Sequence, residues 1–439
     1  MKMKRILNGV LVSSLLALSV SGLFAQGGSE PASGKGGQAS QPTTIVFYTW
    51  EDAPHRALVE EFNRTHTNIQ VDAKILPSSD FNVKLATLLS GHAEMDCFME
   101  KTSPDVYTQY ANGFIEPLNK YIKAAGGSNP AVEAYKTFSY IGDDVVDIPW
   151  RGGAVYTYYN KKVFEKAGIP TPDTYVDKGE WTWKKFEEVA QAIHQADPNL
   201  LGALFNSTAS NHELIASQAG DQILTEDGKI DNVSNVTKQL AIRKRLEATG
   251  AMPSLVNMKV TKTHYSKPFY DGNLGMLIIG EWFPGLINSG AKNGLLNGFT
   301  TDDYGITRMP CDESEYVTHG HPTFSCITSY SKKKEAAFEF ITWMASEAGA
   351  KVTASLGVLP ALTDSEVEKT IAENIPDAQS VQYFLEPKSV KMAGYNKYGS
   401  RVESVLSSLM EDYLLGNLTD SGFESKFKAE LENIVQTSY

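Results

Sequence analysis

Hydrophobic residues in the first third of the chain follow two patterns, one typical of strands and one typical of helices, and segments of the two kinds alternate along the chain. Three short segments, either rich in β-branched and aromatic residues or alternating apolar with polar positions, are predicted as strands: 43–49, 69–75 and 96–99. Apolar residues elsewhere recur every three or four positions, which predicts helices over 54–65, 80–91 and 104–112. The resulting βαβαβ order favours a mostly parallel sheet with helices on both faces.

Ligands of open α/β sheets bind beyond the carboxyl ends of the strands. The residues that follow each predicted strand are therefore candidates for a binding site. In this chain they combine aromatic, acidic and basic side chains. They are Trp50, Glu51, Asp80, Glu100 and Lys101.

A second set of elements follows Gly152 and Gly153, where the backbone turns freely, so the chain is predicted to cross there between two halves of the molecule. A strand at 154–159 and a helix at 160–168 come next. Thr182 is expected to cap a later helix. The inward residues of that helix are expected to be Trp183, Phe186, Ala190 and Ile193.

The composition narrows the range of functions. The chain has 439 residues, 42% of them hydrophobic, and a formal net charge of −12, with no run of five or six basic residues. Nucleic acid is therefore not an expected partner. The three cysteines, Cys97, Cys311 and Cys326, form no CxxC pair, which argues against a zinc ribbon or a thioredoxin-like motif. Cys311 and Cys326 are expected either as a disulfide or as two buried thiols.

The N-terminus has the layout of a secretory signal peptide. Lys2, Lys4 and Arg5 precede an apolar stretch that ends in small residues, and cleavage is expected after Ala25, so the peptide is 1–25. Residues 26–42 are rich in glycine and serine and are expected to form a flexible leader. Gln26 stands where a bacterial lipoprotein would carry its lipidated cysteine, which argues against a lipid anchor. We expect a periplasmic or otherwise extracytoplasmic protein.

Several stretches, in one order along the chain, carry a resemblance to a known family. They are 48–51, 113–118, 158–161 with Phe164 and 167–168, Thr182-Trp183, 269–282, 304–310, 331–344 and 359–361. With these stretches the chain resembles the sugar-binding proteins of bacterial ABC importers, the maltose-binding-protein-like group. The resemblance covers residues 43 to 439.

The resemblance implies a two-lobed α/β fold, the periplasmic-binding-protein fold, in which each lobe is a mostly parallel sheet flanked by helices. Lobe one would hold 43–152 and 306–363, and lobe two 153–305 and 364–439. The implied function is the substrate-binding component of an ABC transporter. It would capture a sugar or oligosaccharide in the cleft by lobe closure and deliver it to the membrane permease. The resemblance implies a monomer with no cofactor, no metal and no catalytic residue.

A sugar site needs a flat aromatic surface for the C–H face of the ring and polar groups for the hydroxyls. Trp50, Trp150 and Trp282 could supply the aromatic surface, and the resemblance places the stacking residue at Trp282; each could instead be a core tryptophan. Arg151 could bind hydroxyls or a carboxylate, or form a salt bridge to Asp147 or Asp144. The resemblance adds Asn211, His321 and Tyr395 by position.

Two alternatives remain open at this point. Glu51, Glu100 and Glu281 could pair as the carboxylates of a secreted carbohydrate-active hydrolase, although no catalytic motif is present. The ligand could also be an acidic sugar, an amino sugar or a polyamine. Arg151 and Lys101 favour an acidic or neutral ligand. His319 and His321 have no third ligand nearby in sequence, so no metal site is predicted.

Overall fold

The computed structural model describes residues 41–50, 53–320, 322–386, 389–391 and 396–437. Pro42–Tyr439 form one compact unit. The expected signal peptide and all but the last two residues of the expected leader lie outside the described residues. None of the described helices is both long enough and apolar enough to cross a lipid bilayer.

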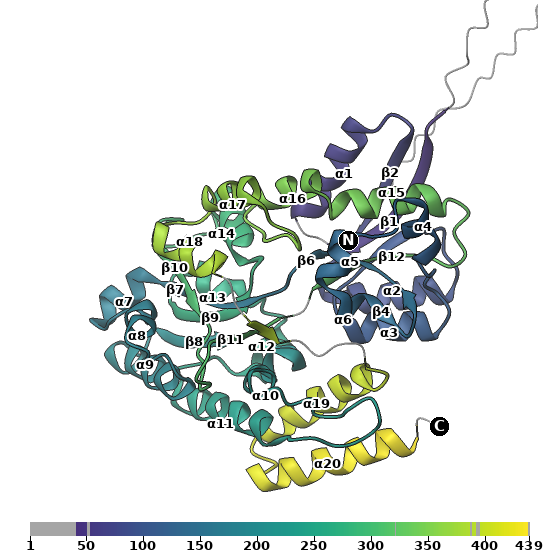
Figure 1. Ribbon diagram of the computed structural model, residues 1–439. Helices are drawn as coiled ribbons and strands as arrows, with labels where there is room; N and C mark the ends of the chain where they lie inside the picture. The colour runs from purple at the N-terminus through teal and green to yellow at the C-terminus, as the bar shows by residue number, and fades with distance from the viewer. Residues whose placement is uncertain (1–40, 51–52, 321, 387–388, 392–395, 438–439) are drawn as a thin grey trace, which may run out of the picture. The chain divides into compact units, whose positions relative to one another are not determined.

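A five-stranded sheet forms the core of the first part of this unit (Figure 1). Its order is β2 (Ile69–Leu76), β1 (Thr43–Trp50), β3 (Cys97–Glu100), β12 (Thr323–Ile327) and β6 (Ile148–Arg151). β1 is parallel to β2 and β3, whereas β12 is antiparallel to both β3 and β6. Four strands thus run in one direction and β12 alone is reversed, which confirms the predicted mostly parallel sheet.

Helices cover both faces of this sheet. α1 (Ala53–Thr65) and α15 (Lys334–Met344) meet over Phe47, whose ring centroid lies 5.1 Å from that of Phe340, which in turn lies 5.0 Å from Phe62. α2 (Phe81–Ser90) packs on the opposite face, where Phe81 lies 5.3 Å from Trp50. Phe47 and Trp50 face opposite ways because side chains alternate along a strand.

A four-stranded sheet forms the second core. Its order is β10 (Tyr304–Arg308), β7 (Val155–Asn160), β9 (Leu274–Gly280) and β8 (Leu201–Phe205). β8 and β9 are parallel, and β7 is antiparallel to both of its neighbours, so again a single strand is reversed. All five residues of β10 pair with β7, so the chain is still part of this sheet at Arg308, beyond the boundary expected at residue 306.

The caps of the second part follow the sequence signals. Asn160 accepts hydrogen bonds from the amides of Lys162 and Val163 at the start of α7 (Lys161–Ala167), which ends at Gly168 in the left-handed conformation. Thr182 caps α9 (Trp183–Ala196) by accepting from the Lys185 amide. The four residues predicted to face inward on α9 are all buried.

A third core is formed mainly by helices. α19 (Gly399–Leu414) and α20 (Asp420–Gln436) pack against each other and against α11 (Ser234–Thr249), and α19 also contacts α12 (Leu255–Thr261) and α3 (Ser103–Ala111) (Figure 1). Because α3 follows β3 of the first sheet, α19 links this helical layer to the five-stranded part.

Three connections run between the two parts: 152–154 between β6 and β7, 309–320 in the stretch between β10 and β12, and 355–364 between α16 (Glu347–Ala354) and α17 (Ser365–Ala372). α16 itself already contributes Ala350 and Ala354 to the second core. Isolated backbone bridges join Ala154 to Gly320 and Arg151 to Pro360. A Cβ at Gly320 would collide with the carbonyl of Gly153, so this close approach requires glycine. The three connections are therefore tied together beside Arg151.

Short elements complete the fold. In the first part they are η1 (Ser78–Asp80), α4 (Asn119–Ala124), α5 (Pro130–Ala134), α6 (Lys136–Ser139), β4 (Tyr140–Ile141) and β5 (Asp144–Val145). Later in the chain they are α8 (Pro172–Asp177), η2 (Ala209–His212), α10 (Leu214–Ala219), α13 (Ser266–Tyr270), α14 (Phe283–Lys292), β11 (Val317–His319), α16 (Glu347–Ala354), α17 (Ser365–Ala372), α18 (Ala378–Leu385) and β13 (Ser389–Lys391).

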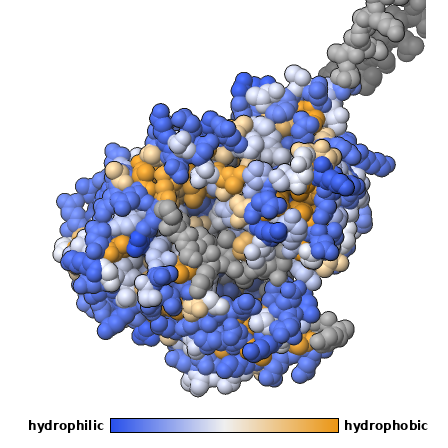
Figure 2. All heavy atoms as spheres, viewed as in Figure 1, coloured by the Kyte–Doolittle hydropathy of each residue, from blue (hydrophilic) through white to orange (hydrophobic). Residues whose placement is uncertain are grey.

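The three cysteines form no disulfide, and the exposed hydrophobic residues do not gather in one part of the chain. Cys97, Cys311 and Cys326 are all free thiols, with Cys97 and Cys326 buried, so the structure favours the thiol alternative over the disulfide. Hydrophilic residues cover most of the face seen in Figure 2, and hydrophobic ones appear in separate groups between them. The exposed large hydrophobic residues, Val83, Val260, Leu295 and Leu415, come from different parts of the chain.

Candidate binding site

The carboxyl edge of the five-stranded sheet brings several predicted residues together. Trp50, Glu100 and Arg151 are the last residues of β1, β3 and β6. Across the reversed strand β12, Glu100 pairs with Phe324 and Arg151 pairs with Thr323. An aromatic, an acidic and a basic residue that are far apart in sequence therefore end on one edge, where α/β sheets bind ligands.

The corresponding edge of the four-stranded sheet meets this one through a salt bridge. β9 ends at Gly280 and is followed by Glu281 and Trp282. Arg151 Nε lies 3.0 Å from Glu281 Oε1, and both side chains are buried, with 6% and 0% exposed. The expected alternative for Arg151 was a salt bridge to Asp147 or Asp144. The structure pairs it with a carboxylate that follows a strand of the other sheet.

Two tryptophans flank this salt bridge. The guanidinium carbon of Arg151 lies 5.0 Å from the ring centroid of Trp282 and 5.3 Å from that of Trp150, within the range of cation–π contacts. Trp282 Nε1 donates a hydrogen bond of 2.8 Å to the hydroxyl of Tyr265. A Cβ at Gly280 would collide with the Trp282 ring, so the glycine lets the indole fold back over the strand end.

The three predicted aromatic platforms differ in exposure. Trp150 is fully buried and Trp50 is 4% exposed, packed against His55 and Phe81 in the core. Trp282 alone of the three is partly exposed. Because stacking on a sugar requires an accessible ring, Trp282 is the best placed of the three for that role, whereas Trp50 and Trp150 belong to the core of the five-stranded part.

Buried polar atoms without hydrogen-bond partners gather near the carboxyl edge of the first sheet. They are both carboxylate oxygens of Glu100, Ser103 Oγ, Trp150 Nε1 and Thr323 Oγ1. A buried polar group left unpaired costs about 1–3 kcal/mol, and most such groups in folded proteins are paired with protein or water. Several unpaired atoms at one edge therefore indicate that another molecule completes them.

Carboxyl groups near this edge have raised pKa values. Burial, and then the charge of Asp105, raises the pKa of Glu100 well above its usual range. Burial raises the pKa of Glu213, which follows η2, to about 7. Burial, together with the charges of Glu213 and Asp105, raises the pKa of Glu403 on α19 to about 8. Groups with such perturbed pKa values are typical of functional sites.

Other predicted residues have structural partners or lie elsewhere. Lys101 Nζ donates to the carbonyl oxygen and the hydroxyl of Ser78 at 2.8 and 3.0 Å. Asn211 is buried, and its amide donates to Thr208 Oγ1 at 2.8 Å within the η2 turn. Asp80 is exposed and pairs with Lys84. Glu51, His321 and Tyr395 lie outside the described residues.

Sequence reasoning missed several residues near this edge: Ser103, Asp105, Glu213, Thr323 and Glu403. Glu213 follows the Asn211 turn directly, so the turn itself was the available signal. Glu403 had none, because a carboxylate on an amphipathic C-terminal helix is typical of a solvated face.

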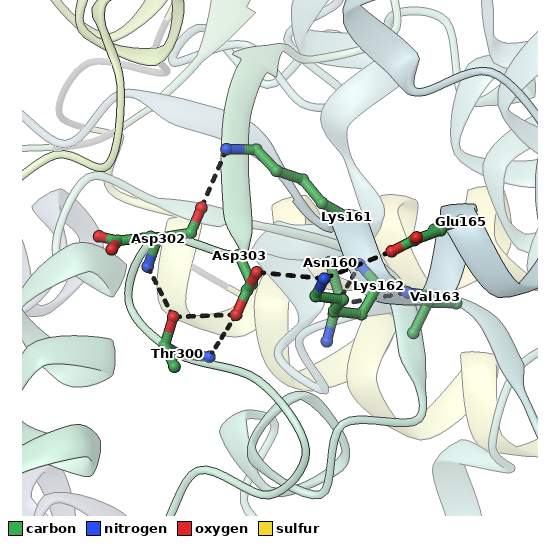
Figure 3. A network of polar contacts seen from close by, with 8 residues as sticks. All are labelled: Asn160, Lys161, Lys162, Val163, Glu165, Thr300, Asp302 and Asp303. Carbon is green, nitrogen blue, oxygen red and sulfur yellow. Dashed lines mark hydrogen bonds and ion pairs between the residues drawn. The ribbon is translucent and has the colours of Figure 1, made fainter.

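A polar network at the other end of β7 provides a contrast (Figure 3). Lys161 Nζ donates to the carbonyl oxygen of Asp302 at 3.1 Å, and Lys162 Nζ lies 3.7 Å from Asp303 Oδ1. Asp303 in turn accepts from the amide and hydroxyl of Thr300. The network fastens the start of β10 to α7, and within it only the side-chain nitrogen of Asn160 is buried without a hydrogen-bond partner.

The described residues contain no group of three His, Cys, Asp or Glu side chains placed to hold a metal ion. The carboxyl groups around α3 and α19 are thus not arranged as a shared ion site within the part of the chain that the structure describes.

The sequence model of one family, described as bacterial extracellular solute-binding protein, matches residues 49–351. A putative binding protein of Brucella abortus is 23% identical over 334 residues, which cover 72% of this chain and 75% of the relative.

Two solved structures share the fold. An ABC substrate-binding protein from Listeria monocytogenes in complex with cycloalternan superposes with a TM-score of 0.72 and 24% identity, covering 90% of this chain and 99% of that one. A solute-binding protein of an ABC transporter from Thermotoga lettingae, bound with α-D-tagatose, has a TM-score of 0.72 and 18% identity, covering 89% and 99%. At these identities the likeness establishes a common fold.

Proposed function

We propose a sugar-capturing role for this chain, which belongs to the bacterial extracellular solute-binding protein family. It would be the extracytoplasmic component of an ABC transporter that binds a mono- or oligosaccharide and hands it to the membrane permease. The observation that carries the proposal is the meeting of two strand edges at Arg151, Glu281 and Trp282. The indole of Trp282 is partly exposed, and the unpaired Trp150 Nε1 and Thr323 Oγ1 lie beside Arg151 in sequence and in register.

The chemistry of the junction suits a carbohydrate. The face of Trp282 can cover the C–H groups of a pyranose ring, and the unpaired oxygens of Glu100 and Thr323 can accept or exchange hydrogen bonds with its hydroxyls. The guanidinium of Arg151, which is fixed by its salt bridge to Glu281, lies against the Trp282 ring and holds it in place. The fold relatives bound with cycloalternan and tagatose support this ligand class by analogy.

The two sheets supply the lobes of the proposed mechanism. Lobe one would contain the five-stranded sheet and lobe two the four-stranded sheet, with the crossing after β10 placed beyond Arg308. A sugar that touches both lobes stabilises the closed arrangement only by the amount that it binds that arrangement more tightly. Export through a signal peptide at 1–25 and action as a monomer belong to the same proposal.

Catalysis is less well supported. Of the carboxylates considered for a hydrolase, Glu281 is held by Arg151 and Glu51 lies outside the described residues. Glu100 is buried with a strongly raised pKa, which would suit a general acid, but the neighbouring carboxylate of Asp105 already accepts hydrogen bonds from Asn82 and Thr102. Binding without turnover is therefore the function that we propose.

A calorimetric sugar screen with one variant pair tests the proposal. At least one mono- or oligosaccharide should bind and remain unaltered, and Trp282→Ala should weaken that binding about tenfold or more, since stacking surface is lost. Trp343→Ala is the matched control: Trp343 is also a partly exposed tryptophan, but it lies on α15 against Phe62. Its affinity should match that of the unmodified protein.

Two outcomes would contradict the proposal. A broad library of neutral, acidic and amino sugars that produces neither heat nor a rise in melting temperature would remove the sugar-capturing role. Release of a shortened glycan during incubation would make the protein an enzyme.

A further inference from the structure

The positive charges near the site are already engaged. The guanidinium of Arg151 is paired with the buried carboxylate of Glu281. The ammonium of Lys101 donates to the carbonyl oxygen and hydroxyl of Ser78 and lies 5.1 Å from the ring centroid of Trp50. From sequence, these two residues favoured an acidic or neutral ligand. In the structure both charges interact with protein groups, so they no longer favour an acidic or neutral ligand.

Acidic side chains, by contrast, come from three elements that pack together: α19, α3 and η2. Ser400, in the first turn of α19, lies 2.9 Å from Thr108 Oγ1 and 3.1 Å from the Pro104 carbonyl oxygen, so this turn contacts α3. Glu403 lies one turn further on the same helix face. Asp105 belongs to α3 itself.

The third element is η2, which packs against α19 and is followed directly by Glu213. The charges of Glu213 and Asp105 both act on Glu403, and the charge of Asp105 also acts on Glu100. We call Glu100, Asp105, Glu213 and Glu403 the acidic group.

Glu100 gives independent evidence that a ligand is missing from this place. The residue is 1% exposed, and neither carboxylate oxygen has a hydrogen bond of good geometry; the Lys101 backbone amide is the donor that acts on its charge. Ser103 Oγ, between Glu100 and Asp105 in sequence, is also buried and unpaired, as is Glu213 Oε1. Buried carboxyl groups are normally paired or hydrogen-bonded. A purely structural role would not leave so many acceptors without donors.

We propose that the ligand carries a protonated amine, as an amino sugar does, and that the acidic group binds this amine. The inference rests on the proposed sugar-capturing role and specifies the class of sugar. An ammonium group offers three donors and one positive charge, which suits the unpaired oxygens of Glu100 and Glu213. Asp105 already accepts from Asn82 and Thr102, and the charge of Lys101 acts on both Asp105 and Glu100.

The titration of the acidic group sets the pH dependence. Glu403 on α19 is faced by Glu213 after η2 and by Asp105 on α3, and Glu100 is faced by Asp105 and Lys101. The pKa values of Glu213 and Glu403 are raised to about 7 and about 8, so both carboxyls ionise as the pH rises through that range. The amine should therefore bind more tightly at about pH 8 than at about pH 6.

Matched ligands that differ only at carbon 2 test the proposal. Glucosamine, N-acetylglucosamine and glucose, and the corresponding β-1,4-linked trisaccharides, present an ammonium, a neutral amide and a hydroxyl on one scaffold. Galactosamine and mannosamine with their parent sugars extend the comparison to other stereochemistries. In calorimetry the ammonium member of the bound series should bind about tenfold tighter or more than its hydroxyl counterpart, and the preference should shrink as salt is added.

Variants assign the preference to the acidic group. Glu403→Gln should reduce the preference for the amine at least about fivefold while it changes the affinity for the neutral counterpart by less than about twofold. Glu411→Gln is the control, because Glu411 is on the same helix but pairs with Lys259 at 2.6 Å. It should leave the preference unchanged.

The outcomes separate the two proposals. If neutral sugars bind as tightly as their amino counterparts, or if the strongest ligands are neutral or acidic, the amine inference is wrong and the sugar-capturing role stands. If Glu403→Gln and Glu411→Gln behave alike, the amine is not bound by the acidic group. If spermidine binds and no sugar does, the sugar-capturing role itself is wrong.

Discussion

At the scale of single residues, the pair formed by Arg151 and Glu281 holds together the proposed site. The two charges are buried, 3.0 Å apart, and belong to segments that leave different sheets. A buried ion pair adds little net stability compared with apolar side chains, but removal of one partner leaves an uncompensated buried charge. The pair is therefore better understood as fixing the register between two strand ends than as a large source of stability.

A double-mutant cycle tests this interpretation. Arg151→Met should lower the free energy of unfolding by about 3–5 kcal/mol, because Glu281 is left buried without its partner. Arg151→Met combined with Glu281→Leu should recover most of that loss, since no charge remains to be buried. Urea unfolding of the single and double variants measures both. Equal losses in the single and double variants would show that the side-chain packing, and not the charge, matters at this place.

At the scale of elements, the contact of α19 with α3 positions the acidic group. Gly399 begins α19, and a Cβ added there would lie 2.8 and 2.9 Å from Pro104 Cγ and Cβ. A rigid proline ring cannot move away as the end of a flexible side chain would. The helix therefore approaches α3 this closely because residue 399 has no side chain.

Substitution of this glycine should move the helix. Gly399→Ala should lower the free energy of unfolding by about 1–3 kcal/mol through overpacking, and it should weaken ligand binding because Glu403 moves with α19. Ser408→Ala, at an exposed position of the same helix, is the control and should alter neither quantity. Thermal unfolding and calorimetry on the same samples would show the effect. Unchanged affinity in Gly399→Ala would mean that α19 does not position the ligand.

Local sequence patterns predicted some features of the elements and not others. The strands at 43–49, 69–75 and 96–99 and the cap at Thr182 were predicted because their signals are local. The predicted roles of Trp50 and Trp150 as platforms depended instead on which side of a strand end faces a neighbour. Periodicity cannot decide that, because both faces of a strand buried in an α/β sheet are apolar.

At the scale of the whole molecule, the three connecting segments are the natural place for lobe motion. The bridges between Ala154 and Gly320 and between Arg151 and Pro360 tie the segments to one another beside the site. A ligand that contacts both sheets would restrict these segments even without touching them, since their opening and the separation of the lobes are one motion.

Hydrogen exchange can detect this coupling. Amides in 152–154 and 359–361 should exchange more slowly when sugar is bound, while amides in α20, which is far along the chain in the helical core, should exchange at the same rate. Trp282→Ala at the same sugar concentration should remove the protection. Equal protection of α20 would indicate general stabilisation by the ligand and not restriction of the connections.

The sequence alone determined the alternation of strands and helices, the mostly parallel sheets and the family, because these follow from periodicities and motifs that are local or collinear. The tertiary structure alone decided the partner of Arg151, the burial of Trp50 and Trp150, and the convergence of Glu100, Asp105, Glu213 and Glu403. The physical reason is that the charge environment of a side chain depends on groups brought close by packing. Glu213 and Glu403 are 190 positions apart in the chain, so no local sequence pattern predicts that their charges interact.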